Sequence, residues 1–296
     1  MTYRCFEVSV ADAIAHIVLS RPDKRNAMVP EFWDELPEIV RDLDESGTIR
    51  AIVLSSTGPH FTAGLDVSVF AQAAAGDSGD DPEAARLARR QRGARFYDDV
   101  RRMQRTFTCL ERCRVPVLAA IQGGCIGGGV DLSTACDMRY ATEDAFFTIF
   151  ETNIGMTADV GTFPRITRLI PEGIARELAY TGRRMGAAEA REVGLVNRVF
   201  PDQATMLAGV MEVAAEIASK APLAIYGCKR MITYARDHTT EDALDYIGIW
   251  NASMLQPDEI MEAMSSNAEK REGRFAELPT VRRTMSKNGD ELNGKN

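Results

Sequence analysis

A glycine-rich turn between a buried strand and a helix restricts the possible folds of this chain more than any other feature of its sequence. The apolar run Val115–Ile121 predicts a strand, and glycines follow at positions 123, 124, 127, 128 and 129 before a helix-compatible run from Val130. The N–H groups of the first residues of a helix have no partner within that helix, so at such a junction they point outward from its N-terminal end. This order favours an α/β fold, in which the turn serves either an anion or a close helix contact.

The glycine spacing limits the chemistry of this turn. A dinucleotide site would need G-x-G-x-x-G and an acid about 20 residues later. Gly124-Cys125-Ile126-Gly127 fits that pattern poorly, and the sequence contains no G-x-x-x-x-G-K-[ST]. Another use of the turn is to expose a backbone N–H to a carbonyl oxygen that gathers negative charge, as in an oxyanion hole. Phe61–Asp66 is a second small-residue turn after a strand, and it would supply another N–H.

Three carboxylates follow the glycine turn within a short stretch. Asp131 lies in the first turn of the predicted helix, where the helix dipole favours its charged form. Glu151 follows the apolar run Phe146–Phe150, and Asp159 comes eight residues later. An acid in apolar surroundings is desolvated, so its pKa rises. Each acid alone is typical of a structural carboxylate, but together they indicate proton-transfer chemistry.

A polar insertion lies between two predicted strands. Gly76–Asp81 is acidic and rich in Gly and Ser, which predicts a mobile loop. Arg86–Arg114 holds ten arginines against three acids, a local charge of +7, and its apolar residues recur at near-helical intervals. The total charge of −8 therefore leaves −15 on the rest of the chain. The long amphipathic helix predicted here either has a solvated cationic face or meets ligand phosphates or an acidic neighbouring subunit.

Composition excludes several classes of protein. A chain of 296 residues with 45% hydrophobic residues can bury a large core in one domain or two. The acidic balance argues against nucleic-acid or membrane partners, and no apolar run approaches the roughly 18 residues of a membrane span. Six cysteines and three histidines show no zinc-ligand spacing, so we expect no metal. The first residues, Met1–Cys5, lack an apolar signal core, so we expect a cytoplasmic location.

The remaining pattern divides the chain into three parts. Short strand patterns alternate with helical ones up to about residue 200, at residues 3–9, 13–19, 51–54, 138–140, 145–149 and 195–200. A helical stripe beyond them is either core or interface, and comprises Val210, Val213, Ala214, Ile217 and Ala218. We expect an α/β core with the ligand site over residues 1–200, a helical region over 201–275 and a mobile polar tail over 276–296.

Several segments together resemble the enoyl-CoA hydratase/isomerase (crotonase) superfamily, from about residue 4 to residue 275. Leu19–Met28 resembles its opening motif, and Phe61–Asp66 and Gly123–Asp131 resemble its two oxyanion-hole segments. Within the superfamily the chain is most similar to the Δ3,5-Δ2,4-dienoyl-CoA isomerases, on Gly127–Leu132, Ala145–Phe147, Ala158–Thr162 and Trp250–Gln256. The resemblance implies a crotonase-like (ClpP/crotonase) spiral of ββα units with a helical C-terminal region for trimerisation.

The resemblance also implies a ligand and a set of site residues. The substrate would be an acyl-CoA thioester whose carbonyl lies between the N–H groups of Leu65 and Gly128, with no metal or redox cofactor and with assembly into homotrimers or homohexamers. The implied catalytic acids are Asp131, Glu151 and Asp159. The implied substrate-binding residues are Arg25, Ala27, Ala63, Gly64, Leu65, Asp66 and Gly129.

The number of acids favours isomerisation over hydration. A 3,5-dienoyl chain becomes 2,4-dienoyl when a proton leaves C2 and another arrives at C6, four bonds away, so two carboxyl groups are needed. We assign Asp159 as base at C2 and Glu151 as acid at C6, although the sequence leaves the direction open, and Asp131 as a residue that tunes their pKa values. Typical hydratases carry Glu where Asp131 stands and usually Gly where Asp159 stands.

Two alternatives remain beside an isomerase of fatty-acid β-oxidation. One is an enoyl-CoA hydratase of the same fold. The other is a non-catalytic RNA-binding or scaffold member of the fold, which only the cationic helix favours.

Overall fold

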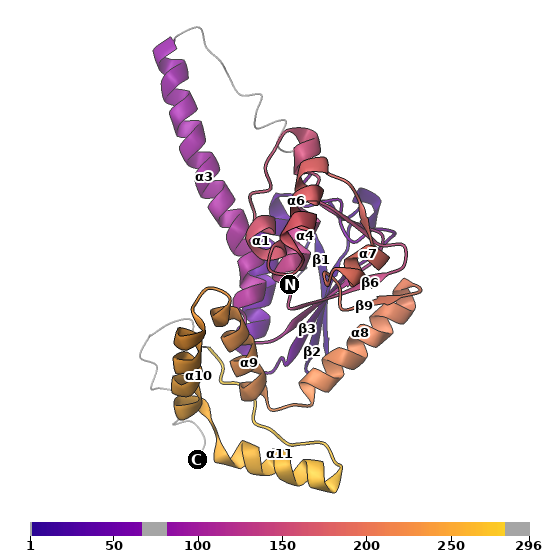
Figure 1. Cartoon of the computed structure of the whole chain (residues 1–296), viewed down its shortest axis with the longest axis vertical. Helices are drawn as coiled ribbons and strands as arrows, with labels where there is room; N and C mark the ends of the chain where they lie inside the picture. The colour runs from indigo at the N-terminus through magenta and orange to yellow at the C-terminus, as the bar shows by residue number, and fades with distance from the viewer. Residues whose placement is uncertain (1, 67–81, 282–296) are drawn as a thin grey trace, which may run out of the picture.

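The computed structural model describes residues 2–66 and 82–281, which form two β-sheets flanked by helices (Figure 1). The first two strands of the larger sheet form an antiparallel hairpin, and its other neighbours are parallel. This arrangement confirms the predicted α/β class. The strand order is β1 (Phe6–Ala11), β2 (Ile14–Leu19), β3 (Ala51–Ser56), β4 (Val117–Ile121), β6 (Met138–Thr142) and β9 (Arg198–Phe200).

The smaller sheet brings the two predicted turns together. It contains β5 (Gly124–Ile126), β7 (Phe146–Thr148) and β8 (Met185–Gly186), with β5 parallel to β7. A β-bridge between Thr62 and Cys125 places the first turn beside β5. The second turn leads into α4 (Gly128–Ala135), which begins two residues before the predicted helix, and the strand β5 within the glycine run was not predicted.

Helices cover both faces of the larger sheet. On one face Val53 and Leu118 pack against α8 (Gln203–Ala218), whose first turn is capped by the Asp202 side chain. Alternate residues such as Ile52 face α1 (Pro30–Ser46) and α3 (Pro82–Arg112), because successive strand side chains point to opposite faces. The stripe on α8 packs on this sheet within one chain, so it is core.

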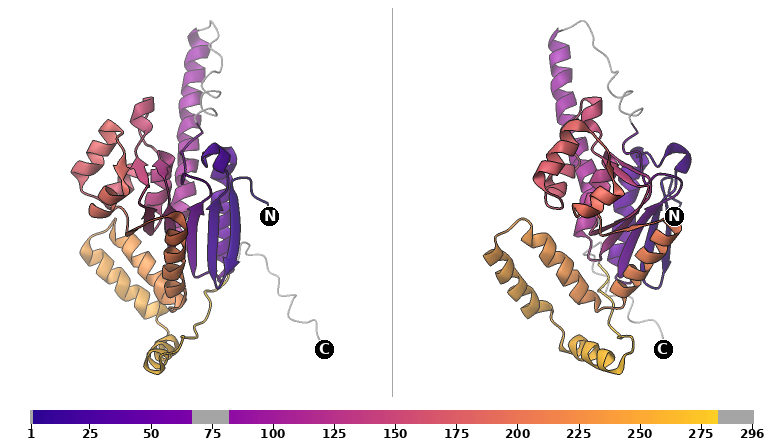
Figure 2. Two further views of the ribbon diagram at one scale, coloured as in Figure 1. Left: turned by 90° about the vertical axis from the view of Figure 1, so that its right-hand side faces the viewer. Right: turned by 45° about the vertical axis from the view of Figure 1, so that its right-hand side comes forward.

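The arginine-rich helix α3 is longer than the core that it joins. It begins and ends slightly earlier than the predicted span, and its N-terminal half projects beyond the body in every view (Figures 1 and 2). Leu87 and Phe96 in that half are 57% and 45% exposed, whereas Phe107 and Leu110 are buried. The predicted apolar face is therefore covered only near its C-terminal end. The loop predicted at 76–81 lies outside the described residues.

Short helices follow the core strands, and longer ones end the chain. The shorter helices are α5 (Thr162–Ile166), α6 (Glu172–Thr181) and α7 (Ala187–Glu192), with 3-10 turns at Pro22–Lys24 and Glu151–Ile154. The last three are α9 (Pro222–Ala235), α10 (Thr240–Met254) and α11 (Pro257–Glu269), which leave Ile232, Leu244 and Met261 at least 64% exposed. Of the helices in the described ranges, none has the length and hydropathy of a membrane span.

The first part of the expected mobile tail is packed against the body. Leu278 is only 6% exposed, and the carbonyl of Pro279 accepts a hydrogen bond from the Arg114 side chain at 2.8 Å. The N–H of Val281 donates to Glu45 at the end of α1. The tail prediction is therefore wrong for residues 276–281, where backbone contacts outweigh the polar composition. Residues 282–296 lie outside the described range.

A buried lysine joins α9 to the core. The Nζ of Lys229 donates to the carbonyls of Leu110 and Val115 at 2.7 and 2.8 Å, and it pairs with Asp137 at 2.8 Å. We expect Lys229→Met to lower the free energy of unfolding by about 3 kcal/mol, because the buried carbonyls of Leu110 and Val115 lose their charged donor. Denaturant unfolding checks this, with Lys220→Met, at an exposed position, as a control expected within about 0.5 kcal/mol. Equal shifts in the two variants would contradict the anchoring role.

Candidate active site

A cavity of about 620 Å³ opens beside the two turns. Its lining includes Leu65 and Gly128, which carry the two predicted N–H donors. It also includes Glu151 and Asp159, two of the three predicted acids. The fold therefore brings four of the predicted site residues to one surface, from four separate segments of the chain.

The first turn directs the N–H of Leu65 toward the cavity. Met28 forms a parallel bridge with Leu65, in which Gly64 O accepts from Met28 N–H at 2.8 Å and Asp66 N–H donates to Met28 O at 3.0 Å. Successive N–H groups of an extended chain point to opposite sides. The N–H of Leu65 therefore points away from Met28, and no acceptor for it is found among the described residues.

The second turn supplies the other donor at close range. Gly128 is the first residue of α4, so its N–H has no partner within the helix. A Cβ built on Gly64 would lie 3.1 Å from Gly128 N and 2.5 Å from Ile126 O, so the two turns touch. Gly64 also has φ +78°, a conformation that favours glycine. The two N–H groups are thus placed side by side, as an oxyanion hole requires.

Glu151 lies directly against the second turn. A Cβ built on Gly127 would lie 3.1 Å from Glu151 Oε1. The carboxyl group of Glu151 therefore lies against Gly127, the residue before Gly128. Its Oε2 is buried and has no hydrogen-bond partner in the described structure. Burial raises the pKa of Glu151, and the charge of Asp159 raises it further. A carboxyl group in this position is suited to exchange a proton with a substrate.

Asp159 is half-buried on another part of the cavity wall, in a segment without regular secondary structure. Burial raises the pKa of Asp159. Two carboxyl groups with raised pKa values therefore share the cavity, and an acid–base pair needs such groups.

Asp131 lies behind the cavity rather than on its wall. Its side chain is fully buried, its Oδ1 accepts the Thr162 N–H at 2.6 Å, and its Oδ2 has no partner among the described residues. Burial and the neighbouring charge of Glu151 raise the pKa of Asp131 to about 7. This placement suits a residue that acts on Glu151 and leaves contact with the substrate to other groups.

The raised pKa of Asp131 predicts a pH-dependent cost in stability. Between the unfolded value of 3.8 and the native value of about 7, the native carboxyl keeps a proton that the unfolded chain has lost. Stability therefore falls as pH rises through that range. We expect Asp131→Asn to raise the free energy of unfolding by roughly 2–4 kcal/mol at pH 8 and by nearly nothing at pH 4.

Denaturant unfolding at the two pH values checks this expectation. Asp98→Asn, on the exposed part of α3, is the control and should change little at either pH. A gain in Asp131→Asn that is equal at both pH values would contradict the proposed titration.

The remaining predicted residues divide into two groups. Arg25, Ala27, Ala63 and Asp66 line the cavity with Leu65. Gly64 and Gly129 lie behind its surface, and Gly129 packs against Thr62 and Cys125. Across the described residues, no group of three His, Cys, Asp or Glu side chains is arranged to hold a metal ion.

Sequence reasoning missed other parts of the wall. The guanidinium of Arg184 lies over the Phe146 ring at 4.2 Å from its centroid, and both residues line the cavity. Trp33 of α1 and Met103 of α3 contribute apolar surface. Only the helical periodicity of α1 and α3 hinted at Trp33 and Met103, and it indicates core as readily as a ligand site.

Comparison with known proteins shows which family the chain resembles in sequence. Residues 9–278 match the enoyl-CoA hydratase/isomerase family. The mitochondrial Δ(3,5)-Δ(2,4)-dienoyl-CoA isomerase of Rattus norvegicus is 43% identical over 274 residues, 92% of this chain and 82% of the relative. The peroxisomal Δ(3,5)-Δ(2,4)-dienoyl-CoA isomerase of Arabidopsis thaliana is 38% identical over 94% of this chain and 99% of its own length.

Solved structures confirm the predicted fold. An enoyl-CoA hydratase from Bacillus anthracis superposes with a TM-score of 0.79 at 30% identity, over 92% of this chain and 99% of that one. A putative enoyl-CoA hydratase from Streptomyces coelicolor A3(2) superposes with a TM-score of 0.82 at 25% identity, over 93% and 95% of the two chains.

The names of the isomerase relatives overturn one prediction. They place those relatives in mitochondria or peroxisomes, so the expected cytoplasmic location is wrong. The inference rested on the missing apolar signal core. Mitochondrial transit peptides are amphipathic and rich in Arg and Ser, so an apolar core is no guide to a mitochondrial location.

Proposed function

Because the chain belongs to the enoyl-CoA hydratase/isomerase family, we propose that it is an isomerase that converts 3,5-dienoyl-CoA to 2,4-dienoyl-CoA in fatty-acid metabolism. The observation that carries this proposal is the presence of Asp159 beside Glu151 in one cavity. Moving two double bonds requires proton transfer at two carbons four bonds apart. Adding water across one double bond gives Asp159 no task.

The two backbone donors support an enolate intermediate. Removal of a proton from C2 moves negative charge onto the thioester oxygen, where the N–H groups of Leu65 and Gly128 would bind it. Donors held by the fold need no reorganisation as the charge develops. The intermediate is delocalised from this oxygen to C6, so protonation at C6 completes the shift of both double bonds.

The position of Glu151 favours it as the group that acts at C2. C2 is bonded to the thioester carbon, and the Glu151 carboxyl lies against Gly127, next to the donor of Gly128. Asp159 comes from a different part of the wall, close to the α3 residues Met103 and Gln104. We therefore assign the C2 proton to Glu151 and the C6 proton to Asp159, the reverse of the direction assigned from the sequence.

Other groups complete the proposal. Lys24, Arg25 and Arg184 bring positive charge to the cavity and would attract the phosphates of CoA. The reaction moves only protons, so we propose that it uses no metal or redox cofactor. The exposed apolar residues on α10 and α11 support assembly into a homotrimer or homohexamer through the C-terminal helices.

Substrate choice tests the function directly. We expect purified protein to convert 3,5-dienoyl-CoA, followed by the absorbance of the conjugated product, at least 100-fold faster than it hydrates 2-enoyl-CoA. Faster hydration would favour the hydratase alternative. No turnover of either thioester, together with salt-sensitive RNA retention, would favour a non-catalytic member of the fold.

A further inference from the structure

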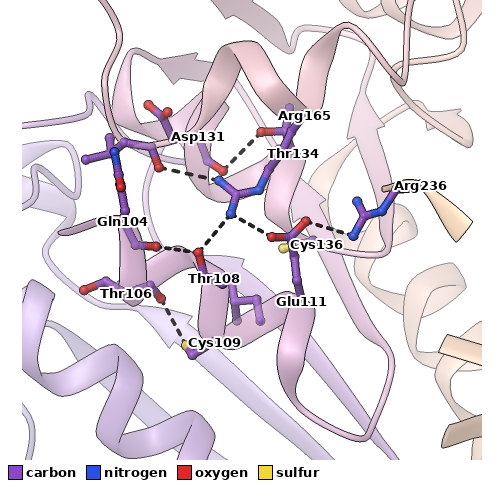
Figure 3. Close-up of polar contacts among 12 residues, drawn as sticks. Gln104, Thr106, Thr108, Cys109, Glu111, Asp131, Thr134, Cys136, Arg165 and Arg236 are labelled. Atoms are coloured by element: carbon purple, nitrogen blue, oxygen red, sulfur yellow. Dashed lines mark hydrogen bonds and ion pairs between the residues drawn. The ribbon is translucent and has the colours of Figure 1, made fainter. Parts of the chain in front are cut away.

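Helix α3 presents a polar stripe to the segment that carries Asp159. Gln104, Thr108 and Glu111 are spaced by four and three residues, so they share one face of the helix. This face meets Arg165, as Figure 3 shows, and the backbone of Asp159. Phe107 and Leu110, on another face of the helix, are buried in the core, so the three aligned polar residues call for a separate explanation.

Gln104 holds the backbone of Asp159. Its Nε2 donates to the carbonyl oxygen of Asp159 at 2.7 Å. Its Oε1 accepts from Arg101 Nη1 at 2.8 Å, which sets the orientation of the amide. The hydroxyl of Thr108 donates to the main-chain carbonyl of Gln104 at 2.7 Å, one turn earlier in the helix. The contact with Arg101 therefore orients the side-chain amide that binds Asp159.

Arg165 links the same segment to helix α3 through its side chain. Its Nη2 donates to Glu111 Oε2 at 2.7 Å and to Thr108 Oγ1 at 3.2 Å, and its Nη1 faces the carbonyl of Val160 at 3.5 Å. A Cβ on Gly161 would lie 1.8 Å from this Nη1, so the guanidinium packs on the bare backbone of that residue. Figure 3 shows Arg165 bound to Glu111, whose other oxygen meets Arg236.

The surroundings make these contacts rigid. The side chains of Arg165 and Glu111 are 10% and 16% exposed, and a charge-assisted hydrogen bond is stronger when water is excluded. The positive charge of Arg165 also opposes the rise in the pKa of Asp131. Thr162, three residues before Arg165, donates its N–H to Asp131. One short segment thus connects two of the three acids.

We propose that Gln104 and Arg165 are positioning residues that hold the Asp159 carboxyl at the distal end of the acyl dienyl system. The proposal rests on the isomerase function proposed above. Asp159 has no helix or strand to orient it, so these side chains provide the fixed geometry that proton transfer to C6 requires.

The test compares Gln104→Met, which keeps the side-chain length and removes the donor, with Arg105→Met on the exposed neighbouring position. We expect kcat for 3,5-dienoyl-CoA to fall about 10–100-fold in Gln104→Met, with KM changed less than about 3-fold. In D2O, deuterium incorporation at C2 per turnover should rise at least 10-fold, because a dienolate that waits longer for a proton at C6 returns to substrate. Arg105→Met should match the wild type.

The outcomes separate a positioning role from a structural one. If Gln104→Met lost C2 exchange and turnover in equal proportion, or kept the wild-type kcat, the positioning role would be refuted. The isomerase function of the wild-type protein would not be affected by either result. Inactive wild-type protein would instead overturn the proposed function. Arg165→Lys gives a second measurement: it keeps the charge beside Glu111, loses the contact on Gly161, and should raise the exchange ratio in the same direction.

Discussion

Asp159→Asn is expected to lower kcat for 3,5-dienoyl-CoA about 10²–10⁴-fold, the usual contribution of a positioned acid or base. Asparagine keeps the size of the side chain but cannot deliver a proton to C6. If Glu151 acts at C2, this variant should still exchange the C2 protons of the substrate with D2O. Mass spectrometry of recovered substrate, beside an absorbance assay of product, measures both steps.

Glu151→Gln is the matched variant for the other end of the reaction. It should lose C2 exchange and turnover together, because without the C2 base no dienolate forms. Asp245→Asn, on the exposed surface of α10, should behave as the wild type. The opposite pattern, with exchange lost in Asp159→Asn and kept in Glu151→Gln, would restore the assignment made from the sequence. Near-normal turnover in Asp159→Asn would refute a two-acid mechanism.

Gly64→Ala is expected to reduce kcat about 10²–10³-fold, comparable to the loss of one oxyanion donor. The added Cβ would lie 2.5 Å from Ile126 O and 3.1 Å from Gly128 N, so the two turns must separate. Separation moves the N–H groups of Leu65 and Gly128 away from the position of the thioester oxygen. Because the donors belong to the backbone, a glycine beside them is the most direct way to alter the site.

Gly194→Ala provides the matched control for this variant. Gly194 has φ +87°, in the same left-handed region as Gly64, but it lies outside the cavity lining and a Cβ there would meet only Leu169 O at 3.5 Å, an ordinary van der Waals contact. Both variants therefore bear the same backbone strain, and only Gly64→Ala disturbs the donors. Thermal unfolding should shift similarly in the two, while the kinetic effect should be confined to Gly64→Ala. Equal kinetic losses would show that strain alone is responsible.

The elements that build the site were predictable because their signals are local. Glycines after an apolar run predict a strand, a turn and a helix from neighbouring residues alone, and β4 and α4 follow that pattern, whereas the short strand β5 within the turn was not predicted. Glu151 and Asp159 were selected by spacing and by resemblance, and the structure places both on the cavity wall. The continuous apolar runs in β3 and β4 likewise predict strands that are buried on both faces.

Other parts were not predictable because they depend on contacts between distant segments. Arg184 reaches the cavity through β8, and Gln104 meets Asp159 across 55 residues of sequence. Periodicity could not show where the apolar face of α3 loses its partner at Leu87 and Phe96, since that depends on how far the body extends. The composition of residues 276–281 likewise concealed that Arg114 would bind their backbone.

Helix α3 carries several tasks on adjacent faces, and this limits how its length can change during evolution. Phe107 and Leu110 belong to the core, Met103 to the cavity wall and Gln104 to the support of Asp159. A helix of 3.6 residues per turn rotates by about 100° for each residue added or removed. A single insertion between Gln104 and Phe107 would therefore rotate the contacts of Met103 and Gln104 out of register with the core contacts of Phe107 and Leu110. An insertion before Phe96, which also lines the cavity, would rotate exposed side chains, so natural length variation should accumulate there.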